Sequence, residues 1–186
     1  MKCLATGDVA AVKACVREAD VVCCTVPSQE PLFQDEDLMR GSAVAGRPRK
    51  QPYISAIGSW QPDMIELDPA LLRRVVSEKD AFNPIAKDCG GAIIVDDRTA
   101  VSEHTGEILQ SGLLLEQMVE LGSVLEMMEK KNSGEDDHHA RLEAWLREGY
   151  VVYKSVGVAL TDLASGEAIL ELAKKHEGMG TLVTDL

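Results

Sequence analysis

The sequence predicts an α/β protein with a doubly wound parallel sheet, that is, a sheet with helices on both faces. Short apolar runs rich in β-branched residues alternate with segments whose apolar residues recur at helical spacing. Uninterrupted apolar runs of this kind are typical of parallel strands that are buried on both faces. With 186 residues, of which 45% are apolar, the chain can bury a substantial core.

The elements expected in the first half of the chain follow from these two patterns and from the turn residues between them. They are a helix at Ala10–Arg17, a strand buried on both faces at Ala19–Val26, a connector over residues 29–49, a strand at Tyr53–Gly58, a helix at Pro69–Val76 and a strand at Ala92–Asp96. Asp68 and Pro69 mark the second helix, because Asp caps a helix N-terminus and Pro fits its first turn. Residues 77–91 lack periodicity, so we expect a flexible surface loop there.

The second half of the chain continues the alternation. The expected elements are helices at Asp97–Leu115 and Leu114–Lys131, a polar loop at Asn132–His139, a short helix at Ala140–Arg147, a strand at Tyr150–Gly157 and a helix at Thr161–His176. Gly112 is expected to separate the first two helices, and residues 130–148 are expected to form a second flexible insertion. Four strands interleaved with helices support the doubly wound arrangement.

The charge balance argues against two kinds of partner. Lys and Arg number 19 and Asp and Glu number 31, which gives a net charge of −12. We therefore expect no binding to nucleic acid or to an anionic membrane surface. No apolar run reaches the roughly 20 residues of a membrane-spanning helix, and the first residues lack the apolar core of a signal peptide. These features predict a cytoplasmic protein.

The cysteines do not form a recognisable framework. There are five, an odd number without CxxC spacing: Cys3, Cys15, Cys23, Cys24 and Cys89. We expect reduced thiols, with Cys23 and Cys24 as small apolar fillers on opposite faces of a strand. A redox role is the alternative.

Three of the expected strands end in small or hydroxyl-bearing residues. The turns are Thr25–Ser28, Ala56–Ser59 and Ser155–Gly157. Ligands of open α/β sheets bind outside the carboxyl ends of the strands. Small residues there let backbone N–H groups approach a ribose, phosphate or nicotinamide amide, and the hydroxyls of Thr25, Ser59 and Ser155 can bond polar edges. The alternative is that these residues only end strands and open turns.

Other candidate sites are less well supported by the sequence. His138 and His139 follow two aspartates, but adjacent histidines in a polar loop lack a scaffold on which to converge, so no metal site is expected. Glu103 and His104 would point in different directions from one helix and form a solvated face. Neither a nucleophile elbow nor a P-loop nor a GxGxxG turn occurs, so a dinucleotide-binding fold here would lack its pyrophosphate-binding beginning.

Four segments in a fixed order carry a family resemblance. They read ADVVCCTVPSQEP, ISAIGSWQPDMIELD, AIIVDDRTAVSEHTGEI and VVYKSVGVALTDL, and they run from residue 19 to residue 162. In this respect the chain resembles the ornithine cyclodeaminase and mu-crystallin family. Because the four motifs occur together and in order, the match is specific and covers most of the chain.

The resemblance implies a domain organisation. Residues 1–157 would be a partial NAD(P)-binding Rossmann-like domain without the leading glycine-rich βαβ unit. Residues 158–186 would be a C-terminal helical segment of the substrate and dimerisation domain. Family members are homodimers that act on imines or amino-acid-derived substrates, and their carboxylate-binding Arg and Lys residues would lie outside this chain. We therefore expect NAD or NADP to bind this chain weakly or not at all.

The resemblance also assigns cofactor-contacting positions, motif by motif. They are Thr25, Val26, Ala56, Ile57, Gly58, Trp60, Ser155, Val156 and Gly157. Ser155 and Val156 would lie near the nicotinamide, and Asp162 would help to fix the following helix. Lys154 belongs to the same K-S-x-G motif, with a plain surface charge as its alternative.

No catalytic residue is assigned, because of one departure from the family pattern. Cyclodeaminases and related alanine dehydrogenases of the family carry an Asp two residues after the glycine, where this chain has Trp60. A carboxylate at this position can act as a general acid or base, whereas an indole can do neither. The resemblance therefore favours an imine or ketimine reductase near the mu-crystallin branch over a cyclodeaminase. A non-catalytic small-molecule or nucleotide-binding protein and an inactive truncated product are the alternatives, and the substrate and the choice between NAD and NADP stay open.

Overall fold

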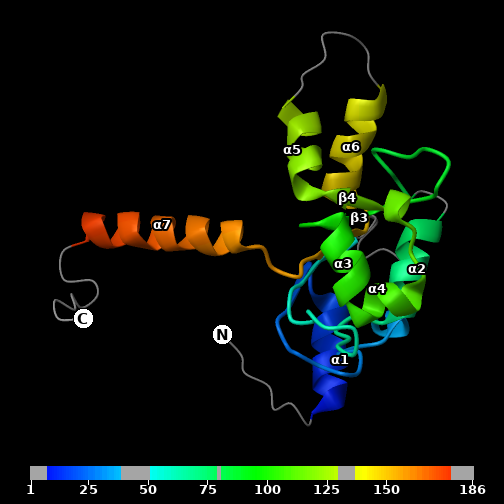
Figure 1. Cartoon of the computed structure of the whole chain (residues 1–186). Coiled ribbons are helices and arrows are strands. Elements are labelled where there is room, and N and C mark those ends of the chain that lie inside the picture. The colour runs from blue at the N-terminus through cyan, green and yellow to red at the C-terminus, as the bar shows by residue number, and fades with distance from the viewer. Residues whose placement is uncertain (1–7, 39–50, 79–80, 130–136, 177–186) are drawn as a thin grey trace. The chain divides into compact units, whose positions relative to one another are not determined.

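Five strands form one sheet in the parts of the chain that the computed structural model describes, which are residues 8–38, 51–78, 81–129 and 137–176 (Figure 1). The strands are β1 (Val21–Cys24), β2 (Tyr53–Ala56), β3 (Ile93–Val95), β4 (Met118–Glu120) and β5 (Val151–Lys154). They lie in the order β1-β2-β5-β3-β4, and every neighbouring pair is parallel. The parallel α/β sheet predicted from the sequence is confirmed.

Three of the described helices begin after an aspartate that caps their first turn. The described helices are α1 (Val9–Glu18), α2 (Pro69–Ser77), α3 (Arg98–His104), α4 (Gly106–Ser111), α5 (Leu121–Glu129), α6 (Asp137–Glu148) and α7 (Ala159–Lys175), with the short 3₁₀ turns η1 (Asp35–Leu38) and η2 (Leu115–Gln117). Asp8, Asp68 and Asp97 each accept a hydrogen bond from a first-turn N–H group of the helix that follows. Gly112 ends α4 in the left-handed conformation that glycine adopts without a steric penalty.

Apolar side chains cover both faces of the sheet. Ile93 and Val95 of β3 belong to one core cluster together with side chains of α2 and α4, while Ile94 belongs to a second cluster with side chains of α5 and α6. Successive residues of a strand point to opposite faces, so the two clusters lie on opposite sides of the sheet. This two-sided packing is what a doubly wound sheet requires, and Figure 1 shows α5 beside α6 and α3 beside α4.

The structure corrects the expected burial of the first strand. β1 lies at the edge of the described sheet and pairs only with β2 there. It is also not buried on both faces. Val21 is 59% exposed and Cys23 is exposed, whereas Cys24 is buried. An edge strand has a neighbour on one side only, and the described helices leave one face of β1 open.

The expected helix at Leu114–Lys131 is also wrong. The segment contains η2, then the strand β4, and only then the helix α5. Met118 and Val119 are fully buried beside β3. The strand was not predicted because three residues are too few to show a periodicity that distinguishes a strand from a helix. The sequence therefore predicted four strands where the described residues form five.

The two expected insertions differ from plain surface loops. In the first, Phe82 and Asn83 are buried, and the Asn83 amide donates to the Glu116 carbonyl oxygen at 2.7 Å. In the second, residues 130–136 lie outside the described residues. Residues 137–148 form α6, in which Leu142 and Trp145 are buried. Buried side chains anchor both segments to the core, which a lack of periodicity could not reveal.

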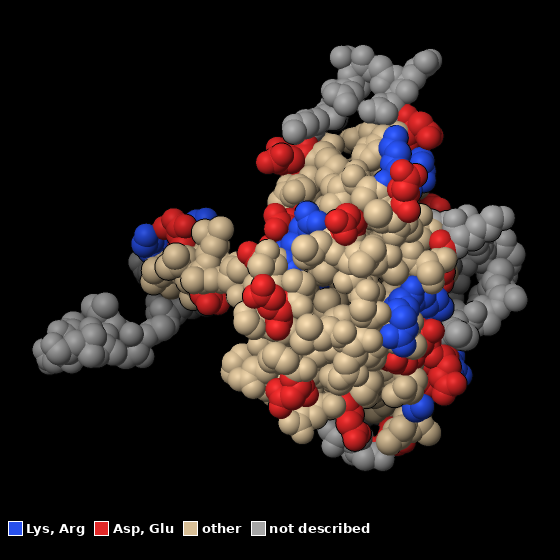
Figure 2. All heavy atoms as spheres, turned by 45° about the vertical axis from the view of Figure 1, so that its right-hand side comes forward, with Lys and Arg blue, Asp and Glu red and all other residues tan. Residues whose placement is uncertain are grey.

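The chain divides into two compact units, Met1–Val156 and Gly157–Leu186. Within the second unit α7 buries none of its side chains, and Leu160, Leu163, Ile169 and Leu170 are each more than 60% exposed. No helix among the described residues is long and apolar enough to cross a membrane. On the face shown in Figure 2, basic side chains form small groups among more numerous acidic ones.

The thiols of Cys23 and Cys24 lie in different surroundings. The four cysteines in the described regions are free, and burial raises the pKa of Cys24 to about 12. Since the thiolate is the reactive form, we expect iodoacetamide to alkylate Cys23 in the folded protein while Cys24 stays protected until unfolding. Tandem mass spectrometry of the peptide that carries both residues measures this. Equal labelling of the two thiols in the native protein would contradict the buried placement of Cys24.

Candidate functional site

Three turns meet at the carboxyl edge of the sheet, because β1, β2 and β5 are parallel neighbours. We call Thr25–Ser28, Ile57–Trp60 and Ser155–Val156 the carboxyl-edge turns. The structure brings together here the positions that the sequence singled out in the first unit. Thr25, Val26, Ile57 and Trp60 are exposed, Gly58 and Val156 are half-buried, and Ala56 and Ser155 are buried. Gly157 is the first residue of the second unit and has a φ of 94°.

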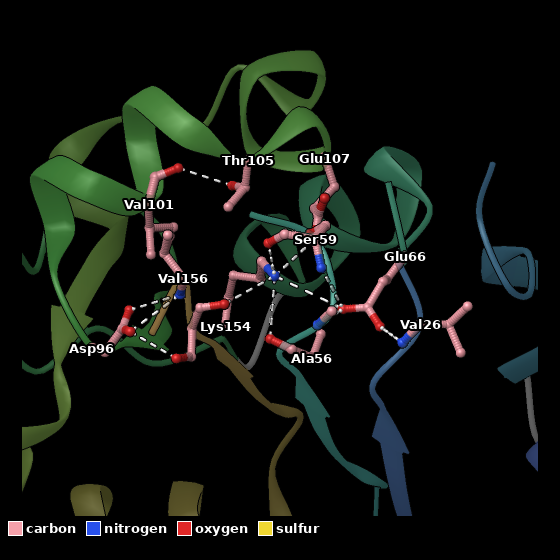
Figure 3. Close-up of polar contacts among 12 residues, drawn as sticks. Val26, Ala56, Ser59, Glu66, Asp96, Val101, Thr105, Glu107, Lys154 and Val156 are labelled. Carbon is pink, nitrogen blue, oxygen red and sulfur yellow. Dashed lines mark hydrogen bonds and ion pairs between the residues drawn. The ribbon is translucent and has the colours of Figure 1, made fainter. Parts of the chain in front are cut away.

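Glu66 ties the first two of these turns to each other (Figure 3). Its side chain is fully buried. Oε1 accepts a hydrogen bond from the N–H of Val26 at 2.8 Å, and Oε2 accepts from the N–H groups of Gly58 at 2.5 Å and Ser59 at 3.1 Å. One carboxylate therefore fixes the spacing between the turn after β1 and the turn after β2.

Lys154, the last residue of β5, ties the second turn to the third. Its ammonium group donates to the carbonyl oxygens of Ala56 at 3.3 Å, Ser59 at 2.8 Å and Ser155 at 3.2 Å. The side chain is fully buried, so the alternative of a surface charge is wrong. An ammonium group has three N–H donors, and main-chain oxygens engage all of them. Lys154 is therefore placed to hold the turns and not to attack a substrate.

The charge of Lys154 is balanced by two buried carboxylates. Its nitrogen lies 3.3 Å from Oε1 of Glu107 and 3.9 Å from Oε2 of Glu66. Glu107 Oε1 also accepts a hydrogen bond from the Ser59 hydroxyl at 2.5 Å. Its Oε2 is buried with no hydrogen-bond partner among the described residues. Burial raises the pKa of the Glu107 carboxyl above its ordinary 4.5, against the opposing effects of Lys154 and Ser59.

The raised pKa of Glu107 predicts a pH-dependent effect of the Glu107→Gln substitution. A carboxyl whose pKa rises on folding stabilises the fold below about pH 4.5, and this contribution is lost as the pH rises through the folded-state pKa. We expect Glu107→Gln to gain stability relative to the unsubstituted chain between that pH and neutrality. Urea unfolding midpoints of both proteins across this range measure the difference. A difference that does not change with pH would contradict the raised pKa.

Asp96, directly after β3, holds the turn after β5. It accepts hydrogen bonds from the Ser155 hydroxyl at 2.7 Å and from the N–H of Val156 at 3.1 Å. The expectation that backbone N–H groups of these turns face a ligand is therefore wrong for Val26, Gly58 and Val156. Their donors are already bonded to Glu66 and Asp96.

Sequence analysis assigned no role in this site to Glu66, Asp96 or Glu107, although all three occur inside the four quoted motifs. The order of the motifs pointed to these segments, but nothing local distinguished carboxylates that hydrogen-bond within the protein from solvated ones. Elsewhere the expectations agree with the structure: Glu103 and His104 are exposed. Within the described regions, no three His, Cys, Asp or Glu side chains are grouped to hold a metal ion.

A parallel sheet covered on both faces, with polar side chains gathered at its carboxyl edge, defines a Rossmann-like α/β domain. No model of a known protein family matches the chain. The mouse ketimine reductase mu-crystallin is 27% identical over 168 residues, which are 89% of this chain and 40% of that protein. The iminosuccinate reductase of Paracoccus denitrificans is 30% identical over 166 residues, which are 87% of this chain and 39% of that protein.

Solved structures agree with these relatives. The probable ornithine cyclodeaminase of Bordetella pertussis Tohama I matches with a TM-score of 0.54 at 27% identity, over 88% of this chain and 42% of that one. The Paracoccus iminosuccinate reductase in complex with NAD⁺ matches with a TM-score of 0.52 at 25% identity, over 85% and 38%. The chain belongs to the ornithine cyclodeaminase and mu-crystallin family, and it spans about 40% of the length of the curated relatives it matches.

Proposed function

We propose that this chain forms part of an NAD(P)-dependent imine reductase, in which the carboxyl-edge turns contact the nicotinamide end of the cofactor. The relatives named as ketimine reductase and iminosuccinate reductase support the reaction class. One observation carries the proposal: the buried side chains of Glu66 and Lys154 and the half-buried side chain of Asp96 fix the three turns relative to one another. A reaction between two bound molecules depends on such fixed contacts, because they set the orientation of the reacting atoms.

The exposed side chains of these turns suit a nicotinamide ring. Val26 and Ile57 are each 48% exposed and Trp60 is 51% exposed, so they offer apolar surface to a flat ring. The Thr25 hydroxyl makes no hydrogen bond to any described residue and can bond the carboxamide. The cofactor, when bound, supplies the hydride. The role of this chain is then to orient the ring and to keep water from it.

The proposal assigns different roles to the two units. Residues 1–157 are assigned to the nucleotide-binding domain without its leading βαβ unit. The outer edge of β1, which pairs with no strand among the described residues, supports this assignment, since a further parallel strand would cover it. Residues 158–186 are assigned to the substrate and dimerisation domain. The exposed apolar side chains of α7 support a role in a homodimer.

Saturation-transfer NMR with NADH and NADPH tests the proposed cofactor contact on this chain and tolerates weak binding. We expect transfer to the nicotinamide protons with a dissociation constant above about 1 μM. Val26→Glu should abolish it, because the added carboxylate adds charge and volume to an exposed position of the first turn. The matched control is Ile85→Glu, since Ile85 is 44% exposed and precedes β3, at the opposite edge of the sheet. No transfer, or equal transfer in both variants, would contradict the proposal.

A non-catalytic binding protein is the second candidate. It is favoured by the chemistry of the exposed side chains, because Val26, Ile57 and Trp60 cannot exchange protons and Lys154, Glu66 and Glu107 are fully buried. The two candidates differ in turnover. Steady-state oxidation of NADH or NADPH with cyclic imine acids by the complete protein supports the reductase, while saturable binding without turnover supports the binding protein.

A further inference from the structure

We propose that the indole of Trp60 is a binding surface for a planar cationic ring or iminium group. Two ligands of the proposed reaction share this chemistry, the oxidised pyridinium ring of the nicotinamide cofactor and a protonated cyclic imine. The identity of these two ligands rests on the proposed function, whereas the preference for a planar cation rests on the indole itself.

The backbone beneath Trp60 is fixed by its neighbour Ser59. Ser59 is fully buried, and each of its polar groups has a buried partner. Its N–H donates to Glu66, its carbonyl oxygen accepts from Lys154 at 2.8 Å, and its hydroxyl donates to Glu107. The next residue, Trp60, is nevertheless 51% exposed. A large aromatic side chain on a fixed backbone presents its surface without a further loss of main-chain freedom when a ligand binds.

The carboxyl-edge turns expose aromatic and apolar side chains. Trp60 is 51% exposed, and Val26 and Ile57, on the same turns, are each 48% exposed. Tryptophan has the strongest cation–π attraction of the aromatic side chains, and its face attracts a cation more than a neutral ring of the same shape.

Ligand-observed NMR on this chain, with the N-methylnicotinamide cation and neutral nicotinamide as probes, tests the preference. We expect the cation to bind about two- to fivefold more tightly, as a partly exposed cation–π contact provides. Trp60→Leu should remove that preference and Trp60→Phe should retain it. Neither substitution changes the net charge, so general attraction to the acidic surface is the same in all three proteins. Ile85→Ala, at the opposite edge of the sheet, is the control that should change nothing.

A second probe separates the two sources of the cation. 1-Pyrroline is titrated below and above its pKa, where it is an iminium ion and a neutral imine. Trp60-dependent preference for N-methylnicotinamide alone identifies a cofactor subsite, and preference for the iminium ion alone identifies a substrate subsite. Both results support the proposal. An unchanged preference in Trp60→Leu, or no preference in the unsubstituted chain, overturns it.

The outcome is distinguishable from failure of the proposed function. A Trp60-dependent cation preference without any saturation transfer to NADH or NADPH supports the proposal for the indole and contradicts the proposed reductase function. Saturation transfer that depends on Val26, without a cation preference, supports the proposed function and contradicts the proposal for the indole. Protection of Cys24 from alkylation checks that each variant is folded.

Discussion

Replacing Lys154 by methionine will destabilise the first unit by about 3–5 kcal/mol, the cost of removing one partner of a buried ion pair. The substitution leaves the fully buried carboxylates of Glu66 and Glu107 without their cation. It also removes the donor to three main-chain carbonyl oxygens. Urea unfolding followed by circular dichroism measures the loss. A loss below about 1 kcal/mol, the range of an exposed pair, would contradict the buried placement of this lysine.

Two further variants show that the effect comes from burial of charge. Lys174→Met removes a lysine whose side chain is 70% exposed and pairs with Glu171, and it should change stability by less than about 0.5 kcal/mol. Adding Glu107→Gln to Lys154→Met removes one of the two uncompensated carboxylates. Glu107→Gln should therefore raise stability more in the Lys154→Met background than in the unsubstituted chain, which an effect of Lys154→Met on side-chain packing alone would not produce.

The second large effect is expected at Gly58, where the turns after β1 and β2 approach most closely. A Cβ atom on this residue would lie 2.4 Å from the Val26 nitrogen and 2.7 Å from the Thr25 carbonyl carbon. It would also lie 2.4 Å from Oε1 of Glu66. Because two of these atoms belong to the backbone, Gly58→Ala must separate the turns, and we expect a loss of about 1–3 kcal/mol. Thermal unfolding measures the loss.

Gly122→Ala is the matched control for Gly58→Ala. Gly122 lies in α5, in the same unit, and nothing lies within 4 Å of an added Cβ atom. Alanine is favoured over glycine in a helix by up to about 1 kcal/mol, so this variant should be neutral or more stable. If both alanine variants behaved alike, the close approach at Gly58 would be refuted. Gly58→Ala should also weaken the proposed cofactor contact at Val26, because it displaces the first turn.

How far the sequence predicts this protein depends on the range over which each signal acts. The Asp68–Pro69 start of α2 and the apolar strands β2, β3 and β5 are local patterns, and the structure confirms them. The carboxyl-edge turns were also located correctly, because parallel strands place their carboxyl ends at one edge. β4 was missed because three residues carry no readable period.

The fold class, the start of α2 at Asp68 and Pro69 and the position of the three turns were thus determined by the amino-acid sequence alone, since each depends on residues close together in the chain. Only the tertiary structure decided which charges are buried. Glu66 accepts a hydrogen bond from Val26, which is 40 residues away in the sequence, and Lys154 donates one to Ser59, which is 95 residues away. A buried lysine or glutamate has the same local pattern as a solvated one, and its burial is stable only because distant segments supply the opposite charge and the hydrogen bonds.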